Sequence, residues 1–571
     1  MKKSLLIVAM ALTSMAGLAQ QKSVNVATAG QLSSLIGASE KYAITDLTVT
    51  GELNGADIAF IRDMAGKDEE GETTEGQLQK LDMKGAKIVS GGVYYTNMRT
   101  TQEYEAEADV VGEMMFSSLK LTDVVLPQEL SRMDYRAFYE CKELASIEGT
   151  ESVGEYGKAV FESCSKLAKV ILPPTMTVVP EAMFSRCSVL DGVELPAGLT
   201  TVEADAFYGC GLTSITLPQS LENIGNDAFG YTDITALVLP ASVRTLGDGA
   251  FSGCKQLADL TLNEGLVTIG ERAFNSVGAE KITVPSTVTS IGSSAFGTCA
   301  NLTEVVLPEG LTTLADYLFD RCDNLTTVNI PSTVTLIDEC AFQNCYALLD
   351  VTLTEGLETI GERAFSSCEA LTSFAAPSTL KSIGPSAFEW CSGLQTVTLN
   401  DGLETIGAGA FQSTPITEIT IPEGITELGV GDGSMWGPSG MVFMGCDQLA
   451  TVHLPSTITS LGRGSFMGCP LEQLTIDAIV PPTIESRSNP FDGECYETCQ
   501  LNVPEGSVDA YKEAAVWSNF TNITASTTTG VKSIDNVQVK ADNRVYNLGG
   551  QRVTKAGRGI LIVDGKKVFK K

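Results

Sequence analysis

Apolar residues recur along most of the chain with a period of 22 or 23 residues, and a phenylalanine marks each repeat. These phenylalanines are Phe116, Phe138, Phe161, Phe184, Phe207, Phe229, Phe251, Phe274, Phe296, Phe319, Phe342, Phe365, Phe388, Phe411, Phe443 and Phe466. Fourteen of the fifteen intervals are 22 or 23 residues, and the exception, from Phe411 to Phe443, is 32. Such a period predicts a solenoid of stacked coils, each burying its apolar edge against the next.

One repeat, beginning at Leu302, shows the pattern of a single coil. Val305 and Leu307 lie two positions apart, which predicts a short strand with both side chains inward. Pro308 ends this strand because proline has no N–H to donate to a neighbouring strand. The second half reads L/V-x-x-I-G-x-x-A-F, which favours a turn, a 3₁₀ segment or a short return strand over a long helix.

Glycine and cysteine occupy fixed places around each phenylalanine. A glycine four residues before it indicates either a backbone with positive φ or a close approach to the next coil. Twelve cysteines lie three residues after it, whereas Cys340, Cys495 and Cys499 lie outside this ladder. We expect buried free thiols in the ladder, with a disulfide stack as the alternative. Cys495 and Cys499 could bridge each other or neighbours on the side of the cap. With no C-x-x-C pair and one histidine, a zinc cluster is unsupported.

The array resembles the BspA-like leucine-rich repeat proteins, which are common on the surfaces of Bacteroidetes and some other host-associated microbes. The motif L-x-x-V-x-L-P-x-x-L-x-x-I-G-x-x-A-F-x-x-C carries this resemblance over about residues 112–480. The resemblance implies a leucine-rich repeat fold and a secreted or outer-surface protein, and some members are adhesins for host matrix proteins or other bacteria. It supplies no catalytic motif and no cofactor.

The regions before the array predict an export signal and a cap. Lys2 and Lys3 precede the apolar run Leu5 to Leu12 and small residues up to Ala19, so residues 1–19 are predicted to be a signal peptide. Residues 20–111 are predicted to form a small α/β cap. Thr28 and Gln31 could form a capping box there. Strands are expected around Leu47–Leu53 and Leu81–Met83, and Asp57 is expected to cap a short helix.

After the array, residues 481–524 are predicted to form a C-terminal cap. Its signals are a strand at Leu501 to Pro504 and a helical stripe from Val508 to Trp517. Residues 525–530 form a Ser/Thr linker. Residues 531–571 are predicted to be a basic β-rich tail. The tail resembles the C-terminal segments of many Bacteroidetes surface proteins and, more loosely, type IX secretion sorting domains, although it is shorter. A plain basic tail without a sorting role is the alternative.

Charge narrows the class of partner. The chain has 571 residues and a net charge of −32, although residues 531–571 carry ten Lys and Arg against three Asp. So acidic a body repels phosphate backbones and makes nucleic acid an improbable partner. It would favour cationic partners or divalent ions, or simply keep an exposed protein soluble. No stretch of the sequence is apolar enough to predict a transmembrane helix.

Two surfaces are candidates for binding a protein partner. The first is the strand-face stripe, the outward position two residues before each proline, which is small and nearly uncharged. Its candidate residues are Val306, Asn329, Thr352, Thr398, Thr420 and His453. An ordinary exposed sheet would have the same composition, because β-branched residues favour strands. The stripe lacks Trp and Tyr, which argues against a sugar-stacking platform.

The second candidate is the insertion between Phe411 and Phe443, which contains Asp432 and Trp436. Long loops on rigid scaffolds often carry function, and tryptophan is enriched in binding hot spots. A tolerated insertion with its tryptophan folded onto the coil is an equal alternative.

These features predict a binding protein rather than an enzyme. His453 is the only histidine, so a Ser-His-Asp triad or a histidine metal site has little to build on. We therefore expect a secreted or cell-surface protein that mediates protein–protein interaction or adhesion to host or bacterial surfaces. A structural surface component without a dedicated ligand is the alternative. A glycoside hydrolase ranks third. Such enzymes use a pair of carboxylates, but in a chain this acidic such pairs are unavoidable and therefore carry little evidence.

Overall fold

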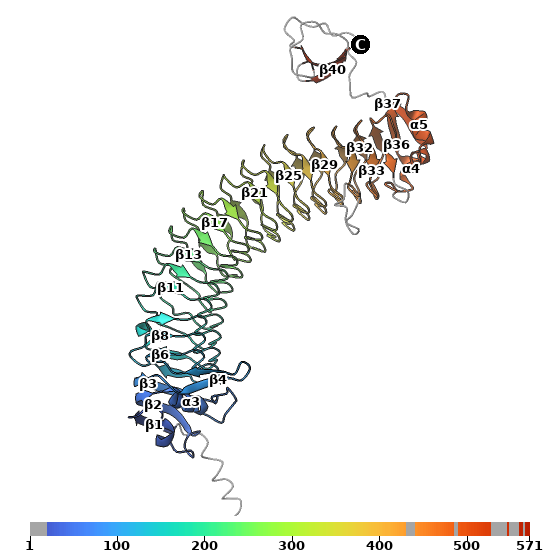
Figure 1. Cartoon of the computed structure of the whole chain (residues 1–571). Helices are drawn as coiled ribbons and strands as arrows, with labels where there is room; N and C mark the ends of the chain where they lie inside the picture. The colour runs from blue at the N-terminus through green and yellow to red at the C-terminus, as the bar shows by residue number, and fades with distance from the viewer. Residues whose placement is uncertain are drawn as a thin grey trace, which may run out of the picture. The chain divides into compact units, whose positions relative to one another are not determined.

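The computed structural model describes residues 20–429, 440–484 and 489–526, together with the backbones of three strands in the tail. The chain divides into two compact units, and Figure 1 labels the helices and strands along it. Unit 1 comprises Met1–Leu311 and Ala315–Pro331, and unit 2 comprises Thr312–Leu314 and Ser332–Lys571. The predicted signal peptide, residues 1–19, lies outside the described residues. So do Asp432 and Trp436 of the insertion and residues 527–530 of the linker.

Unit 1 begins with three long strands that pair side by side with the strands of the first coils. They form one parallel sheet in the order β1-β2-β3-β7-β9. The strands are β1 (Gln20–Val26), β2 (Ile44–Leu53), β3 (Lys80–Ile88), β7 (Asp123–Val125) and β9 (Ser146–Glu148). The helices α2 (Leu32–Leu35) and α3 (Gly55–Met64) lie in the connections. The two strands predicted in this region are confirmed as β2 and β3, and β1 precedes them.

Asn54, rather than Asp57, is the N-cap residue of α3. Its side chain accepts a hydrogen bond from the Asp57 N–H, and the Asp57 carboxylate accepts one from the Asn54 N–H at 3.0 Å. Asp57 also accepts hydrogen bonds from the N–H groups of Gly30 and Leu32, and so holds α2 against α3. The predicted Thr28–Gln31 capping box is wrong, because Gln31 makes no side-chain cap to α2 and Asp57 performs that role.

Side chains of the N-terminal region close the open end of the first coil. Along the array each coil donates N–H groups to carbonyls of the next, as from Phe116 to Ala137 at 2.8 Å. The first coil has no preceding coil to donate to its own carbonyls. Instead the Tyr94 hydroxyl donates to Glu113 O at 2.9 Å, and the Arg62 guanidinium donates to Met115 O at 2.8 Å. Burial lowers the pKa of Arg62 to about 10.

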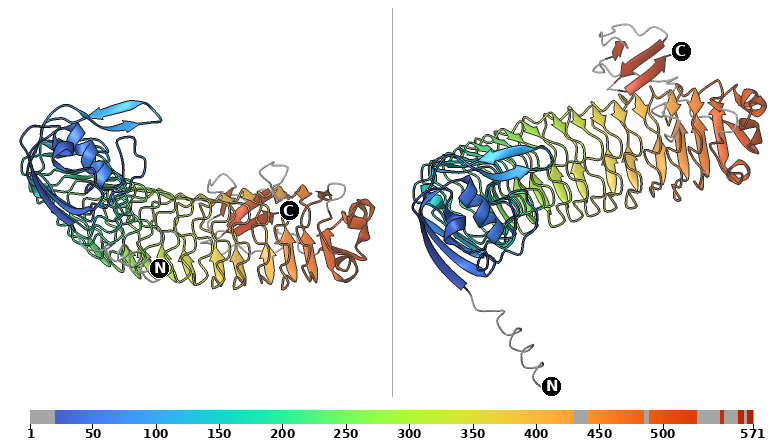
Figure 2. Two further views of the ribbon diagram at one scale, coloured as in Figure 1. Left: turned by 90° about the horizontal axis from the view of Figure 1, so that it is seen from below. Right: turned by 60° about the horizontal axis from the view of Figure 1, so that its bottom comes forward.

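Tyr94 belongs to an antiparallel hairpin, β4 (Val93–Asn97) and β5 (Gln102–Glu105), which projects beside α3 in Figure 2. The ring of Tyr95 on the same strand lies 4.9 Å from the Arg62 guanidinium. The hairpin therefore supports the buried arginine that caps the first coil.

Each coil of unit 1 contributes parallel strands to the solenoid. After β7 and β9, the strand face contains β14 (Ala236–Val238), β16 (Asp259–Thr261), β18 (Lys281–Thr283), β20 (Glu304–Val306) and β22 (Thr327–Asn329). The return strands are β6 (Val110–Val111), β8 (Arg132–Met133), β10 (Glu155–Tyr156), β11 (Val178–Val179), β12 (Thr201–Val202), β13 (Asn223–Ile224), β15 (Thr245–Leu246), β17 (Thr268–Ile269) and β19 (Ser290–Ile291). A 3₁₀ turn, η1 (Thr150–Ser152), interrupts one coil. The predicted short-strand return is confirmed.

Unit 2 repeats this plan. Its strand face contains β24 (Asp350–Thr352), β26 (Ser373–Ala375), β28 (Thr396–Thr398), β30 (Glu418–Thr420), β32 (Thr451–Leu454), β34 (Gln473–Ile476), β36 (Gln500–Pro504) and β37 (Asn522–Ser526). The return strands are β21 (Thr313–Leu314), β23 (Leu336–Ile337), β25 (Thr359–Ile360), β27 (Ser382–Ile383), β29 (Thr405–Ile406), β31 (Glu427–Leu428), β33 (Ser460–Leu461) and β35 (Thr483–Ile484).

The repeated phenylalanines form a stack of buried rings within each unit. In unit 1 the stack runs from Phe116 to Phe319 with centroids 5.2–6.0 Å apart. In unit 2 it runs from Phe342 to Phe466 with centroids 5.2–5.7 Å apart. Phe491, which the repeat pattern did not identify, extends this stack at 5.7 Å from Phe466.

The recurring glycine serves close coil-to-coil contact rather than positive φ. A Cβ on Gly270 would lie 2.6 Å from the carbonyl carbon of Gly247, and one on Gly384 would lie equally close to that of Gly361. Positive φ falls instead two residues before and two after each phenylalanine, for example at Arg272 and Ser276 around Phe274. The structure thus decides between the two explanations that the sequence left open.

The cysteines are buried, and none forms a disulfide in the described residues, as expected for the ladder. The thiol of Cys164 donates to Phe138 O at 3.1 Å, and Cys187 to Phe161 O at the same distance. Burial raises the pKa of Cys187 to about 12, which disfavours the reactive thiolate. Cys495 and Cys499 lie in side-chain contact, but the disulfide considered for them is absent.

A cluster of large aromatic rings closes the end of the phenylalanine stack in unit 2. Phe491 meets Tyr496, Trp517 and Phe520 edge-to-face at 5.3–6.0 Å. Trp517 Nε1 donates to Pro482 O at 2.8 Å. The segment contains α4 (Cys495–Thr498), α5 (Val508–Glu513) and η2 (Trp517–Asn519). The predicted strand is β36, but the predicted helix ends at Glu513, before Trp517.

The tail contains an antiparallel sheet of β38 (Val545–Asn547), β39 (Gly559–Val563) and β40 (Lys566–Lys570). These strands fall where the sequence predicts them; the proposed strand near Arg552 lies outside the described residues. Across the described part of the chain, no helix combines the length and the apolarity that a membrane span requires.

Candidate functional site

The structure places the predicted strand-face residues on exposed strands and pairs several of them in register. Val306 on β20 lies opposite Asn329 on β22 in unit 1, and Thr420 on β30 lies opposite His453 on β32 in unit 2. Thr398 lies opposite Ala375, and Thr352 ends β24. The sequence therefore predicted correctly that this position points outward.

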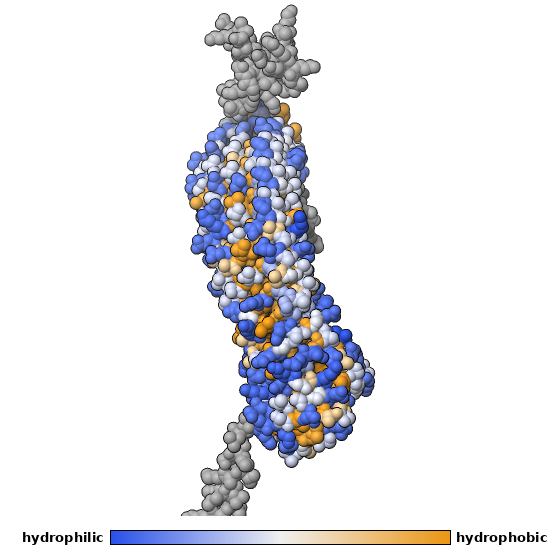
Figure 3. Space-filling model, turned by 90° about the vertical axis from the view of Figure 1, so that its left-hand side faces the viewer, coloured by the Kyte–Doolittle hydropathy of each residue, from blue (hydrophilic) through white to orange (hydrophobic). Residues whose placement is uncertain are grey.

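The strand-face stripe carries a few large apolar side chains among small polar ones. Ile171, Val238 and Val306 are 54%, 61% and 43% exposed. Figure 3 shows one face of the molecule, on which apolar patches, in orange, lie among hydrophilic side chains, in blue. Mixed surfaces of this kind are typical of protein contacts, where apolar side chains sit within a polar rim.

His453 has a specific partner on the strand face. Its Nε2 lies 2.9 Å from Asp477 Oδ2, one residue beyond the end of β34. The interaction is a partly buried ion pair when the ring is protonated. In the described residues no group of three His, Cys, Asp or Glu side chains is placed to hold a metal ion.

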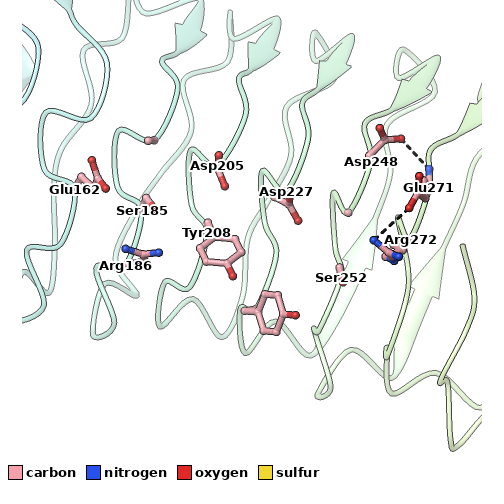
Figure 4. Close-up of a pocket in the computed structure, with 13 residues that line it drawn as sticks. Glu162, Ser185, Arg186, Asp205, Tyr208, Asp227, Asp248, Ser252, Glu271 and Arg272 are labelled. Atoms are coloured by element: carbon pink, nitrogen blue, oxygen red, sulfur yellow. Dashed lines mark hydrogen bonds and ion pairs between the residues drawn. The ribbon is translucent and has the colours of Figure 1, made fainter. Parts of the chain in front are cut away.

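A second candidate site lies in unit 1, on the outside of the turns that carry the phenylalanines. We call it the turn-face cavity. Its volume is about 690 Å³, and it extends across successive coils from Glu162 to Arg272. Figure 4 shows the carboxylates of Asp205, Asp227 and Asp248 in one row on three coils, with the ring of Tyr208 beside Asp205. Arg186 and Arg272 lie toward opposite ends of the row.

The local backbone explains why these side chains point outward together. Asp205 and Asp227 each lie two residues before a buried phenylalanine, with φ of 56° and 51°. Aspartate tolerates this left-handed conformation better than most residues. The N–H of Asp205 donates to Asn226 O at 2.9 Å and that of Asp227 to Asp248 O at 2.7 Å. The stacked backbones thereby hold the side chains in register.

Two glycines leave the space that the cavity residues occupy. A Cβ on Gly249 would lie 2.3 Å from Asp227 Oδ1, and a Cβ on Gly253 would lie 2.7 Å from the ring of Tyr231. Both glycines have positive φ, of 63° and 74°. The coil around Phe251 therefore accommodates the aspartate and the tyrosine of the preceding coil.

Burial and neighbouring carboxylates raise the pKa values of Asp205 and Asp227. Burial raises the pKa of Asp205, and Asp227, Glu181 and Glu162 add to the rise, while Arg186 opposes it. Burial and Asp248 raise the pKa of Asp227, and Arg272 opposes it. The negative charge of the cavity is therefore only partly balanced by its own arginines.

Two tyrosines form the aromatic part of the cavity. The rings of Tyr208 and Tyr231 meet edge-to-face, with centroids 5.3 Å apart and an interplanar angle of 62°. Tyr231 is 57% exposed, so its ring is accessible to a ligand. Sequence reasoning missed this site because it considered the strand face and the insertion. The available signal was an acidic residue two or three positions before Phe207, Phe229 and Phe251, with tyrosine following two of them.

The repeats match the family described as "BspA type Leucine rich repeat region" over residues 109–235, 222–349, 312–431 and 439–541. The chain belongs to this family. The family assignment agrees with the observed solenoid and with the resemblance noted in the sequence. No curated protein sequence matches the chain significantly.

Several solved structures are similar to this BspA-type chain. A leucine-rich repeat protein from Bacteroides ovatus shares 25% identity, with 65% of this chain and 94% of that chain covered and a TM-score of 0.48. A leucine rich cell surface protein from Faecalibacterium prausnitzii shares 24% identity, with 67% and 85% covered and a TM-score of 0.31. The pneumococcal vaccine antigen PcpA shares 18% identity, with 73% and 85% covered and a TM-score of 0.33.

Proposed function

We propose that this chain is a secreted or cell-surface protein whose repeat array binds a protein partner and mediates adhesion to a host or bacterial surface. The observation that carries the proposal is the strand-face stripe, which presents in-register exposed side chains such as Val306 and Asn329 on a repeat fold of the BspA type. Solenoids commonly bind partners through extended surfaces of this kind.

A binding assay on immobilised matrix proteins and on neighbouring bacterial cells tests this proposal. Thr352→Lys combined with Thr398→Lys places charge on two exposed strands of unit 2 and should reduce binding about tenfold or more, because an unpaired charge is desolvated in the contact. Thr289→Lys combined with Thr335→Lys is the matched control, since both residues are exposed but lie beside the return strands β19 and β23. Equal binding by wild type and the strand-face double variant would remove the strand face as the contact.

Surface display is tested separately by removing residues 531–571. We propose that this tail, whose β38, β39 and β40 form an antiparallel sheet, is read by an export or surface component. The truncated protein should fold with an unchanged melting temperature but should be lost from the cell surface in a fractionation assay. Normal display of the truncated protein would contradict a sorting role and leave a plain basic tail.

A further inference from the structure

The turn-face cavity of unit 1 has three features that an ordinary solvated acidic face does not need. It is a hollow of about 690 Å³ rather than a flat row of carboxylates. It contains a tyrosine pair with one exposed ring. Gly249 and Gly253, both left-handed, leave the space in which Asp227 and Tyr231 lie. Shape, aromatic surface and charge therefore occur together at one place.

The charge of the cavity is negative after its internal pairs are counted. Five carboxylates line it, from Glu162, Asp205, Asp227, Asp248 and Glu271. Arg186 and Arg272 line it as well, and Arg272 NH1 already lies 3.2 Å from Glu271 Oε1. Among the described residues neither Asp205 nor Asp227 has a salt-bridge partner, although Arg186 acts on Asp205 and Arg272 on Asp227 at longer range. These two neighbouring carboxylates are half-buried in the cavity and available to an external cation, as is the exposed carboxylate of Asp248 on the next coil.

The spacing of the carboxylates suits a planar cation. Asp205 and Asp227 occupy the same position in adjacent coils, and hydrogen-bonded strands lie about 4.8 Å apart. A guanidinium presents several N–H donors in one plane and can contact two carboxylates on that scale. Tyr231 lines the same cavity, and the exposed part of its ring is available for a cation–π contact.

We infer that the turn-face cavity binds the guanidinium or ammonium side chains of a basic segment on a protein partner. The inference rests on the proposed function in so far as the partner is a protein, but it assigns a different surface from the strand face. The net charge of −32 adds long-range attraction for a basic partner.

The direct test is titration of the full chain with a labelled oligo-arginine peptide, followed by fluorescence anisotropy, with an oligo-glutamate peptide as the negative probe. Asp205→Asn combined with Asp227→Asn keeps the shape of both side chains. It should weaken oligo-arginine binding about tenfold, the scale expected when two partly exposed charge pairs are lost. Asp259→Asn combined with Asp350→Asn removes the same charge from exposed strand positions and should change binding less than twofold.

Equal weakening by the two double variants would overturn the inference, because it would reduce the effect to long-range attraction. The tyrosine ring gives a second measurement. Tyr231→Ala should weaken binding about threefold, whereas Tyr231→Phe keeps the π face and should bind as wild type does. No loss in Tyr231→Ala would remove the aromatic part of the site.

The pH dependence provides a readout that a merely structural role would not give. Because the pKa values of Asp205 and Asp227 are raised, these groups become neutral earlier than ordinary aspartates as the pH falls. Oligo-arginine binding should weaken between pH 7 and about pH 4, while the peptide keeps its charge throughout. The facing groups are Glu162, Glu181, Arg186, Asp248 and Arg272. An unchanged pH profile in Asp205→Asn/Asp227→Asn would contradict the inference.

Three further outcomes distinguish this inference from a sugar-binding cavity and from the adhesion proposal. A neutral oligosaccharide that binds in place of the peptide, with loss in the Asp205 and Asp227 variants, would overturn the basic partner and assign the cavity to sugars. Peptide binding that survives in a protein without any adhesion would support the cavity and remove the adhesive role. Adhesion that is lost in the strand-face variants, without any oligo-arginine binding by wild type, would remove the cavity alone.

Discussion

The turn faces of the two units share one backbone but present different side chains. In two neighbouring coils of the turn-face cavity in unit 1, the position two residues before phenylalanine holds Asp205 and Asp227, and in three successive coils of unit 2 it holds Arg363, Ser386 and Gly409. All five residues have positive φ between 51° and 64°. The phenylalanine rings behind them stack with nearly the same spacing in both units.

Inward positions therefore determine the coil, whereas outward positions are free to differ. In unit 1 the outward residues form the acidic, tyrosine-containing turn-face cavity. A cavity in unit 2 lies farther along the coil, beside Ser392, Thr414 and Asp447, and its lining is polar without aromatic rings. The chemistry of each surface region in this molecule thus depends on the outward side chains of a few coils, while the backbone of the coils stays the same.

The largest expected effect comes from removing one ring from each stack. Phe229→Ala in unit 1 and Phe388→Ala in unit 2 should each lower the free energy of unfolding by about 3–5 kcal/mol, because each ring is buried and stacked on both sides. Urea denaturation of each variant measures the loss. A loss confined to one unit would break the claim that the two scaffolds are equivalent.

A smaller effect should follow from filling the close contact between coils. Gly270→Ala in unit 1 and Gly384→Ala in unit 2 place a Cβ 2.6 Å from backbone carbon of the preceding coil. Each should cost about 1–3 kcal/mol through overpacking. Gly198→Ala is the control, since its Cβ would have no neighbour within 4 Å, and it should be neutral or slightly stabilising. Neutral behaviour at Gly270 and Gly384 would indicate that the coils can separate without cost.

Much of the fold could be predicted because the core residues of a solenoid recur at the same position in every repeat. Phenylalanine, cysteine and the strand residues each recur where neighbouring coils pack the same atoms together, so periodicity alone identifies them. The ends could not be predicted in this way, because they are made by residues used once. Arg62 and Tyr94 close the first coil through contacts with Met115 and Glu113, about 20 to 50 residues away in the sequence.

Of the two candidate sites, the strand-face stripe could be predicted from the sequence and the turn-face cavity could not. The outward stripe followed from strand alternation, so residues such as Thr398 and His453 were placed correctly, but the Asp477 partner of His453 was not foreseen. The turn-face cavity depends on which side chains meet across three successive coils and on the space above Gly249 and Gly253. A repeat consensus records only the residues that most coils share. It therefore identifies the fold but omits the side chains, particular to a few coils, that form the cavity.

The smallest expected effect concerns the stability of unit 1 itself. Raised pKa values mean that folding favours the protonated forms of Asp205 and Asp227, so their contribution to stability is largest at low pH and is lost as the pH rises through the raised values. Asp227→Asn should therefore raise the melting temperature slightly at pH 7. The corresponding gain in the free energy of unfolding should be less than about 1 kcal/mol, because the carboxyl group is partly exposed. Near pH 3 the wild-type carboxyl is already largely protonated, so wild type and variant should melt together.

Asp259→Asn, on the open strand face, should show no such pH-dependent difference. A destabilised Asp227→Asn at pH 7 would mean that the carboxylate stabilises the folded coil, and it would turn the charge of this cavity from an available binding feature into a structural one.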